Sequence, residues 1–260
     1  MAGLTEGWRI QVRVIIALMI RELTTRFGRE NIGFLWVMVE PLLFAGLVAI
    51  VWAAMRGSET HGISIISFVI TGYIPLTLFR SAVSRSVKVF EVNGNLLYHR
   101  QIKLIDFIFV RFLIEMIGSL FALMFIGTAL YVVGIFPLPY SFGHMLLGWL
   151  LYSLFTFSMC LVIAPLSEMS DILEKFIPVV TYLMIPLSGT FFLVQWLTPS
   201  MREFILWSPP VTAMELLRFG LYGHSMRPYY DISLVVIFSL IMTVIGLALC
   251  RKVRRTLVVG

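Results

Sequence analysis

Residues 104–134 read LIDFIFVRFLIEMIGSLFALMFIGTALYVVG, an almost wholly apolar run that holds only three charged side chains. A helix that crosses the hydrocarbon layer of a membrane needs roughly 20 apolar residues at a rise of 1.5 Å each. Five further runs of spanning length or nearly so occupy residues 34–55, 63–83, 145–166, 176–194 and 232–250. The sequence therefore predicts an all-α integral membrane protein with six transmembrane helices, forming a single domain over residues 1–260.

The composition supports the same fold class. The chain is 59% hydrophobic and 13% charged, with a mean hydropathy of +0.95, whereas soluble domains are about 45–50% apolar and about 25% charged. The net charge is +6, but the basic residues cluster beside apolar runs. Anionic lipid headgroups explain such clusters, so no nucleic-acid partner is expected. Cys160 and Cys250 lie inside apolar runs without metal-ligand spacing, which predicts no metal site and no disulfide.

The distribution of lysine and arginine predicts the orientation. With both chain ends on one side of the membrane, fifteen of these residues fall on that side and four on the other. Basic residues accumulate in cytoplasmic loops. We therefore expect a multi-pass membrane protein with both termini in the cytoplasm.

Residues 1–30 are expected to hold a cytoplasmic interface helix. Val12, Ile15, Ile16, Met19 and Leu23 share one face of a helical wheel, with Arg13, Arg21 and Thr24 roughly opposite. This pattern suits a helix in the plane of the membrane surface. A helix packed on the rest of the protein is the alternative. A cleavable signal peptide is not expected, because Arg21-Glu22 interrupts the apolar stretch at once.

The segment between the last two spans has a different pattern. Pro199, Pro209-Pro210 and Gly223 divide it into two short apolar pieces, neither long enough to cross a bilayer. Broken helices at membrane depth are tolerated only where protein or a water-filled cavity covers them. Residues 198–223 are therefore predicted to form a re-entrant helical hairpin.

Charged and aromatic residues inside the spans are the remaining candidates for function. The chain has no P-loop, Gly-rich nucleotide fingerprint or HExxH motif, so no catalytic residue is predicted. Charges at membrane depth point to function by default, and four are found, namely Glu40, Asp106, Arg111 and Glu115. The spacing of the last two lets them pair on one helix face, and a structural pair is favoured over a proton relay. Six aromatic residues could line a central pathway, with ordinary helix packing as the alternative: Tyr73, Tyr152, Tyr182, Phe191, Phe192 and Trp196.

Several motifs resemble the permease subunit of type-2 ABC exporters, most closely the branch that exports capsular polysaccharide. Residues 17–41, ALMIRELTTRFGRENIGFLWVMVEP, resemble its N-terminal signature. Matching positions continue through Ser84-Arg-Ser-Val87, Glu91, Asn93, Arg100, Lys103, Ile105-Asp106, Arg111, Glu115, Trp207-Ser-Pro-Pro-Val211, Glu215 and Arg218. The family often has prolines beside Arg100 and Lys103 where this chain has Gln101 and Leu104, which favours a cytoplasmic helix that runs on into the third span.

The resemblance implies a location in the bacterial inner membrane and a mechanism. Such permeases form homodimers and move a lipid-linked acidic polysaccharide from cytoplasm to periplasm along the dimer interface. This chain would bind no cofactor, since a separate cytoplasmic ATPase binds ATP and Mg²⁺. Periplasmic and outer-membrane export components are implied as further partners. Residues expected to couple to the ATPase are Arg21, Glu22, Arg26, Arg85, Glu91, Asn93, Leu97, Arg100, Glu168 and Asp171, and the hairpin at 198–223, with Arg202, Trp207, Glu215 and Arg218, would form a periplasmic gate.

Three other functions remain open from the sequence. One is export of another glycan or lipid, such as an O-antigen or a teichoic acid. An ion-coupled secondary carrier would use Glu40, Asp106 and Glu115 and need no ATPase partner. A membrane-embedded transferase is the third, and the missing catalytic cluster counts against it.

Overall fold

A computed structural model describes residues 3–27, 59–60, 62–96 and 101–259, with positions 39, 43, 46–48, 50–52, 54 and 55 between them. Most of the predicted span at 34–55 lies outside the described residues, as do Glu40, Leu97 and Arg100.

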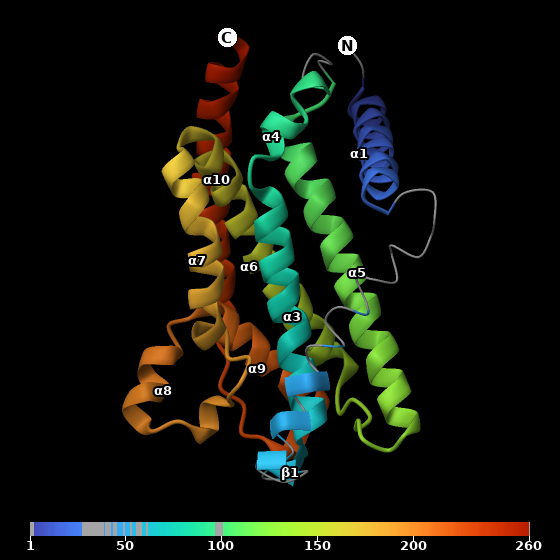
Figure 1. Ribbon diagram of the computed structural model, residues 1–260, viewed down its shortest axis with the longest axis vertical. Coiled ribbons are helices and arrows are strands. Elements are labelled where there is room, and N and C mark those ends of the chain that lie inside the picture. Colours follow the sequence, from blue (N-terminus) through green and yellow to red (C-terminus); the bar gives the residue numbers. More distant parts are fainter. Residues whose placement is uncertain are drawn as a thin grey trace.

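Four long helices run along a bundle (Figure 1). They are α3 (Ile65–Ser86), α5 (Leu104–Val132), α6 (Phe142–Met169) and α10 (Ile232–Val259). Each is long and apolar enough to cross a membrane, α10 as far as Arg255, and they match the spans expected at 63–83, 104–134, 145–166 and 232–250. The prediction of a helical membrane protein is confirmed.

Both chain termini lie at one end of the bundle (Figure 1), which we call the terminal end. The short helix α4 (Val89–Val92) and the first turns of α5 are found there, together with the start of α7 (Asp171–Leu187). The opposite end, the far end, holds α8 (Pro199–Ile205) and the two-residue strands β1 (Glu59–Thr60) and β2 (Ile63–Ser64).

The two strands form an antiparallel pair in which Glu59 lies opposite Ser64 and Thr60 opposite Ile63. The all-α prediction did not include them. Apart from this hairpin, the described part of the chain is helical or irregular. Three 3₁₀ turns complete the structure, at Gly94–Leu96 (η1), Val194–Trp196 (η2) and Gly223–Ser225 (η3).

α5 begins abruptly at Leu104. Lys103 has an extended backbone, and its N–H donates to Asp106 Oδ2 at 2.9 Å. A carboxylate in the first turn satisfies a backbone donor that the helix leaves free. The expectation of a helix that runs on from Gln101 into the span was therefore wrong, because Asp106 caps the helix at this point.

α7 differs in its bounds from the predicted span at 176–194. The helix begins at Asp171, before the predicted start of the span, and only Ser170 separates it from the end of α6 at Met169. It ends at Leu187, where the chain turns through Gly189 at φ +73°, a left-handed conformation that glycine adopts without strain. Phe191 and Phe192 therefore lie in a loop after α7 and not in its last turn.

α6 is the centre of the packing, with α3, α10 and α9 (Pro209–Tyr222) lying against it. Two glycines allow a very close approach of α9. A Cβ atom on Gly148 would collide with the backbone of Leu217, and one on Gly220 would collide with the backbone of Met145. α9 is consequently almost wholly buried, whereas α8 is largely exposed.

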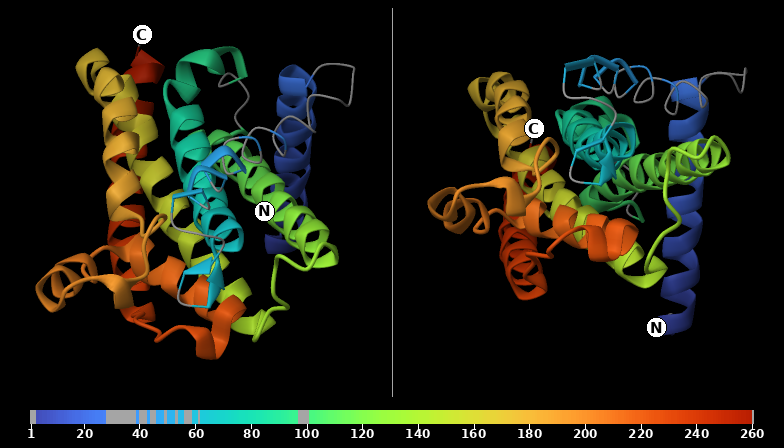
Figure 2. Two further views of the ribbon diagram at one scale, coloured as in Figure 1. Left: turned by 60° about the horizontal axis from the view of Figure 1, so that its bottom comes forward. Right: turned by 90° about the horizontal axis from the view of Figure 1, so that it is seen from below.

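The N-terminal helix α1 (Leu4–Phe27) lies across the bundle axis. Figure 2 shows it lengthwise in the right panel, where the bundle is seen end-on from below. Its inner face packs on α5, with Leu18 buried. Ile16 and Ile20 stay exposed beside Arg13. The packed alternative is thus correct for the inner face, while the outer face mixes apolar and basic side chains as an interface helix would.

Candidate functional site

A buried carboxylate joins three helices at the terminal end. Glu115 of α5 is 2% exposed and accepts from Arg26 of α1 and from Arg85 of α3, whose Nε lies 2.6 Å from Glu115 Oε1. Burial lowers the pKa of Arg26, and the neighbouring Glu115 partly opposes that effect. Two arginines on one buried carboxylate leave the cluster paired, as a buried charge requires.

Arg111 has a different partner from the one expected. Its Nε lies 3.1 Å from Glu22 Oε1 on α1, and its Nη1 donates to the Arg85 carbonyl at 2.6 Å. The predicted pairing of Arg111 with Glu115 was wrong. Both side chains reach neighbouring helices instead, since α1 and α3 offer opposite charges and a free carbonyl at the end of a helix.

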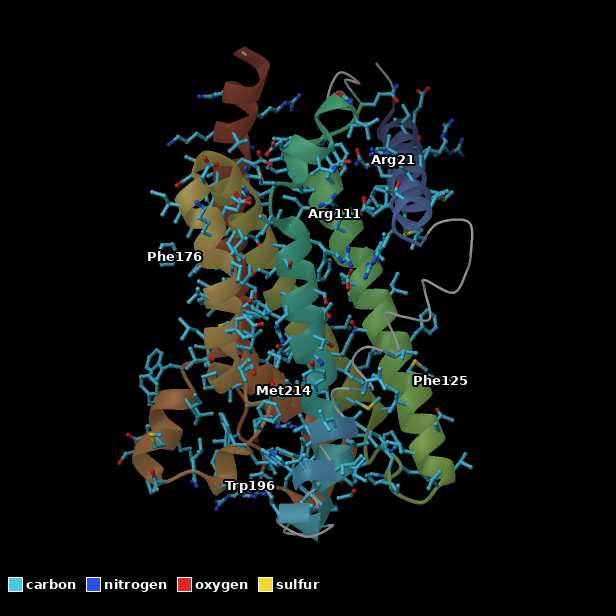
Figure 3. All side chains as sticks on the ribbon, viewed as in Figure 1. Arg21, Arg111, Phe125, Phe176, Trp196 and Met214 are labelled. Carbon is cyan, nitrogen blue, oxygen red and sulfur yellow. The ribbon has the colours of Figure 1, made fainter. Side chains whose placement is uncertain are left out.

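Two further polar contacts bind α1 to the same cluster. Gln11 donates to Asp106 Oδ1 at 2.6 Å, and Arg21 donates to Asn93 Oδ1 at 2.8 Å. Figure 3 shows Arg21 and Arg111 together at the terminal end, near the contact of α1 with α5. Asn93 is 3% exposed, so its side chain serves this internal contact. We call these contacts, from Gln11 to Arg26, the α1 clamp.

A second charged cluster lies between α4 and α7. Lys88, at φ +47°, brings its Nζ within 3.3 Å of Glu174, 3.4 Å of Glu91 and 3.6 Å of Asp171. Hydrogen bonds that Lys88 donates to Glu174 and Glu91 raise the pKa of Lys88 above its usual range. Glu168 Oε1 accepts from the N–H groups of Phe90 and Glu91 at 3.0 Å each. α4 is therefore held to the α6–α7 corner.

The outer side of this cluster is an exposed patch of mixed character. Val92 and Ile172 are 67% and 68% exposed beside the exposed carboxylates of Glu91 and Asp171. We call these four residues the α4–α7 patch. Exposed apolar side chains that form a patch rimmed by polar residues are typical of a protein docking site.

A polar groove of about 680 Å³ runs between α3 and α7 from the terminal end toward the middle of the bundle. Its α3 wall spans Tyr73 to Arg85, about 18 Å at 1.5 Å per residue, and its α7 wall spans Glu174 to Tyr182. The guanidinium of Arg80 lies 4.7 Å from the centre of the Tyr182 ring. The lining also carries the hydroxyl groups of Thr77, Ser81, Ser84 and Thr181.

The six predicted pathway aromatics are divided between three places. Tyr73 and Tyr182 line the groove. Tyr152 is 1% exposed within the core, and its ring lies edge-on to that of Phe155. The other three lie near the far end, where Trp196 packs on Phe68 at 5.0 Å between ring centroids and Phe191 packs on Trp52. The structure thus does not bring all six together.

The hairpin residues also separate. Trp207 is 78% exposed, and Arg202 holds α8 to the segment before α10 through Tyr229 Oη at 2.9 Å. Arg218 is fully buried and donates to the carbonyls of Phe68, Gly189, Thr190 and Phe192. Glu215 accepts from the Val194 N–H at 3.0 Å. α9 is thereby anchored to α3 and to the loop after α7.

The arrangement just described has no acid–base pair aimed into a closed cavity, and among the described residues no group of His, Cys, Asp and Glu side chains could hold a metal ion. Comparison with known families gives the identity. The family model described as "ABC-2 type transporter" matches residues 13–222. The chain belongs to the ABC-2 transporter family. It is a membrane permease, and the match covers most of the elements described above.

This ABC-2 permease is similar to named relatives over nearly its whole length. It is 36% identical over 95% of its length to the capsule polysaccharide export inner-membrane protein CtrC of Neisseria meningitidis, 93% of which is covered. It is 34% identical to the capsule polysaccharide export inner-membrane protein BexB of Haemophilus influenzae, with the same coverage. The polysialic acid transport protein KpsM of Escherichia coli is 25% identical, with 95% of each chain covered.

Membership of this family decides between the broad alternatives. The ABC-2 permease is the membrane subunit of an ATP-driven transporter, so an ion-coupled carrier and a membrane transferase are set aside. Sequence reasoning missed Lys88, Gln11, Arg80 and Glu174. The sequence did carry a signal for the groove side of α3. Polar side chains recur on one side of this apolar helix, at Tyr73, Thr77, Arg80, Ser81 and Ser84. Lys88 gave none, because its role depends on a turn that brings three separate carboxylates together.

Proposed function

We propose that this ABC-2 permease is the inner-membrane subunit of an exporter that moves capsule polysaccharide from cytoplasm to periplasm. The observation that carries the proposal is the 36% identity to CtrC across 95% of the chain. BexB supports the same assignment at 34% identity. The similarity to both capsule export proteins extends over the regions that form the α1 clamp and the groove.

The proposed assembly is a homodimer of six-span subunits. The four long helices, α7 and the segment at 34–55 supply the spans, and residues 1–260 form one domain. Both termini lie in the cytoplasm, which places the basic terminal end at the cytoplasmic leaflet, as the positive-inside rule favours. A separate ATPase binds ATP and Mg²⁺, and periplasmic and outer-membrane components receive the polymer.

The groove between α3 and α7 is the proposed cytoplasmic part of the polymer path. Arg80 and Arg85 supply positive charge to an acidic polymer, although Arg85 is shared with Glu115. Tyr73 and Tyr182 supply aromatic faces on which the apolar face of a sugar ring packs. Hydroxyl groups between them exchange hydrogen bonds with the sugar, as they do with water. In a homodimer, two such grooves would flank one path.

The α4–α7 patch is the proposed docking surface for the ATPase. It is exposed, and the Lys88 cluster connects it to α7, which forms one wall of the groove. The α1 clamp joins the same region to α1 and α5. Movement of the ATPase would then reach the groove through α7 and the α3–α4 corner.

The hairpin is proposed as the periplasmic gate, with unequal roles for its two helices. α8 is exposed and is held mainly by Arg202. α9 is buried against α6 and fixed by Arg218. The moving part of the gate is therefore α8 with its following turn, and α9 is the fixed support.

Complementation tests the proposed function. The chain and the ATPase that co-purifies with it are produced in an encapsulated strain lacking its own inner-membrane permease. Polymer should reach the periplasm only with both subunits present and the ATPase intact. Transfer of O-antigen or teichoic acid, with capsule polymer left in the cytoplasm, would assign the alternative glycan substrate.

A further inference from the structure

We propose that a membrane phospholipid binds in a slot between α5, α6 and α9 at the far end of the bundle. An apolar cavity of about 430 Å³ lies there, lined by the last turns of α5, the first turns of α6 and two leucines of α9, Leu217 and Leu221. Its volume is in the range of small-molecule sites. This slot lies on the other side of α3 from the groove, and nothing in the proposed polymer path uses it.

A second cavity of about 400 Å³ adjoins the first. Phe136, Pro137, Leu138 and Leu221 line both. The second cavity is more polar than the first, with hydroxyl groups from Ser64, Tyr140 and Ser225, and the described residues that line it carry no charged side chain. An apolar cavity that continues into a polar one at the end of a membrane helix has the two-part character of a phospholipid, an acyl chain followed by a headgroup.

The dimensions match one leaflet. The apolar lining on α5 extends from Leu120 to Tyr131, about 16 Å along the helix at 1.5 Å per residue. Half of the hydrocarbon core is about 15 Å. The apolar cavity therefore has the length of one acyl chain lying parallel to the bundle, with its polar end at the membrane surface.

The mouth of the slot is continuous with surface that faces lipid. Met124, Phe142 and Leu146 line the slot and are 48%, 57% and 37% exposed. Figure 3 shows Phe125, next to Met124, pointing outward from α5, and Phe125 is 62% exposed. The molecules in contact with this surface are bilayer lipids, so the acyl chain that enters the slot comes from the bilayer.

Photolabelling tests the slot. The permease, purified with its ATPase subunit in detergent micelles, is mixed with phosphatidylethanolamine that carries a diazirine on one acyl chain. Label should concentrate in residues 120–149 and saturate at low probe concentration, and unlabelled phosphatidylethanolamine should compete. Equal labelling of the exposed face of α10, at Ile241 and Val244, or competition by polyprenyl phosphate but not by phosphatidylethanolamine, would overturn the proposal.

Variants that fill the slot provide the second arm. Gly127 lines the slot, and a Cβ atom there would contact the Phe136 ring at 3.4 Å, an ordinary distance. Gly127→Leu should reduce labelling at least about fivefold, the change given by ~1 kcal/mol of lost binding. Leu146→Trp, at the mouth, should do the same without adding bulk inside the bundle. Ala129→Leu adds similar bulk to an exposed position of α5 outside the slot and should leave labelling unchanged.

Unchanged labelling in both filling variants, with the protein folded, would contradict the slot. The readout requires no transport, so failure of the capsule assignment and failure of the lipid site are distinguishable.

Discussion

At the scale of single residues, the charged side chains at the terminal end form contacts between helices. Glu115 binds arginines of α1 and α3, and Arg111 binds a carboxylate of α1. A buried carboxylate that loses its partners retains the cost of leaving water without the compensating attraction. These contacts join three helices, which favours the predicted structural role over a proton relay.

Removing one partner of Glu115 should destabilise the permease. Arg26→Gln leaves the carboxylate with Arg85 alone, and Glu115→Gln removes the carboxylate that both arginines contact. We expect each change to cost roughly 3 kcal/mol, the lower end for a broken buried pair, because Arg85 is partly exposed. The double variant should cost less than the sum, since the two side chains are in contact. Thermal unfolding in detergent measures all three.

The control for this set of single and double variants is Arg202→Gln at the far end of the bundle. Its effect should add to that of Glu115→Gln, because the two residues share no partner. Additive effects of Arg26→Gln and Glu115→Gln would contradict the contact.

Gly72 gives a second prediction at this scale. A Cβ atom at this position would collide with the Thr190 carbonyl oxygen and with Arg218 Nη2. Gly72→Ala should therefore destabilise the far end by about 1–3 kcal/mol, as overpacking does. Gly143→Ala, where the nearest atom lies 4.0 Å away, should be neutral or stabilising. Equal melting temperatures for the two variants would show that Arg218 is not held as described.

At the scale of elements, α1 and α7 connect the surface to the core. α1 lies across the bundle and is clamped to α5 and to Asn93 after α4. α7 receives Lys88 near its first turns, and its end is followed by the carbonyls that Arg218 binds. The α4–α7 patch lies between the contact that α1 makes with Asn93 after α4 and the contacts that Lys88 makes with α7. A force applied to that patch reaches both walls of the groove.

Charge reversal in the patch tests the docking role. Glu91→Arg should lower ATPase stimulation and export while membrane insertion and melting temperature stay nearly unchanged, because Glu91 is exposed. Val92→Asp should have the same effect by placing a charge in an apolar contact. Glu6→Arg, an equal reversal at an exposed site near the start of α1, is the matched control. Stimulation that survives both patch variants would exclude the patch as the docking surface.

Sequence patterns predicted the positions of the helices better than the contacts of the charged side chains. The apolar runs located α3, α5, α6 and α10, and Pro199 and the pair Pro209-Pro210 located α8 and α9, since these signals are local to each segment. Arg111 and Glu115 were assigned to each other because spacing along one helix is visible in the sequence. Their true partners, Glu22, Arg26 and Arg85, are set by how α1 crosses the bundle, which no local pattern contains. The buried state of Arg218 depends in the same way on the loop after α7.

At the scale of the whole molecule, the two ends differ in character. The terminal end is rich in charged side chains, contains the α1 clamp and faces the proposed ATPase. The far end combines the exposed α8 with the buried α9. The groove occupies the terminal half of the bundle, so the proposed polymer path would continue beyond it along the surface that the proposed homodimer encloses.

The unequal hairpin predicts a pattern of thiol reactivity. Single cysteines at Met201 and Phe204 of α8, and at Trp207 in the turn after it, should react with a membrane-impermeant maleimide added from the periplasmic side. Cysteines at Ala213, Met214 and Leu217 of α9 should not, because those side chains are buried. Reactivity on α8 should change when the ATPase is trapped with ATP. A uniform response along both helices would contradict a fixed α9.

Site-specific photocrosslinking to the polymer tests the central claim, that the α3–α7 groove conducts an acidic polysaccharide. A photoreactive phenylalanine analogue replaces Tyr182 in the groove, Ser84 on its opposite wall, or Phe125 on the outward face of α5 as the matched control. Export is stalled by trapping the ATPase with ATP. The account predicts polymer crosslinks at Tyr182 and Ser84 and none at Phe125. Crosslinks at Phe125, or none at either groove position while polymer is held in the complex, would contradict it.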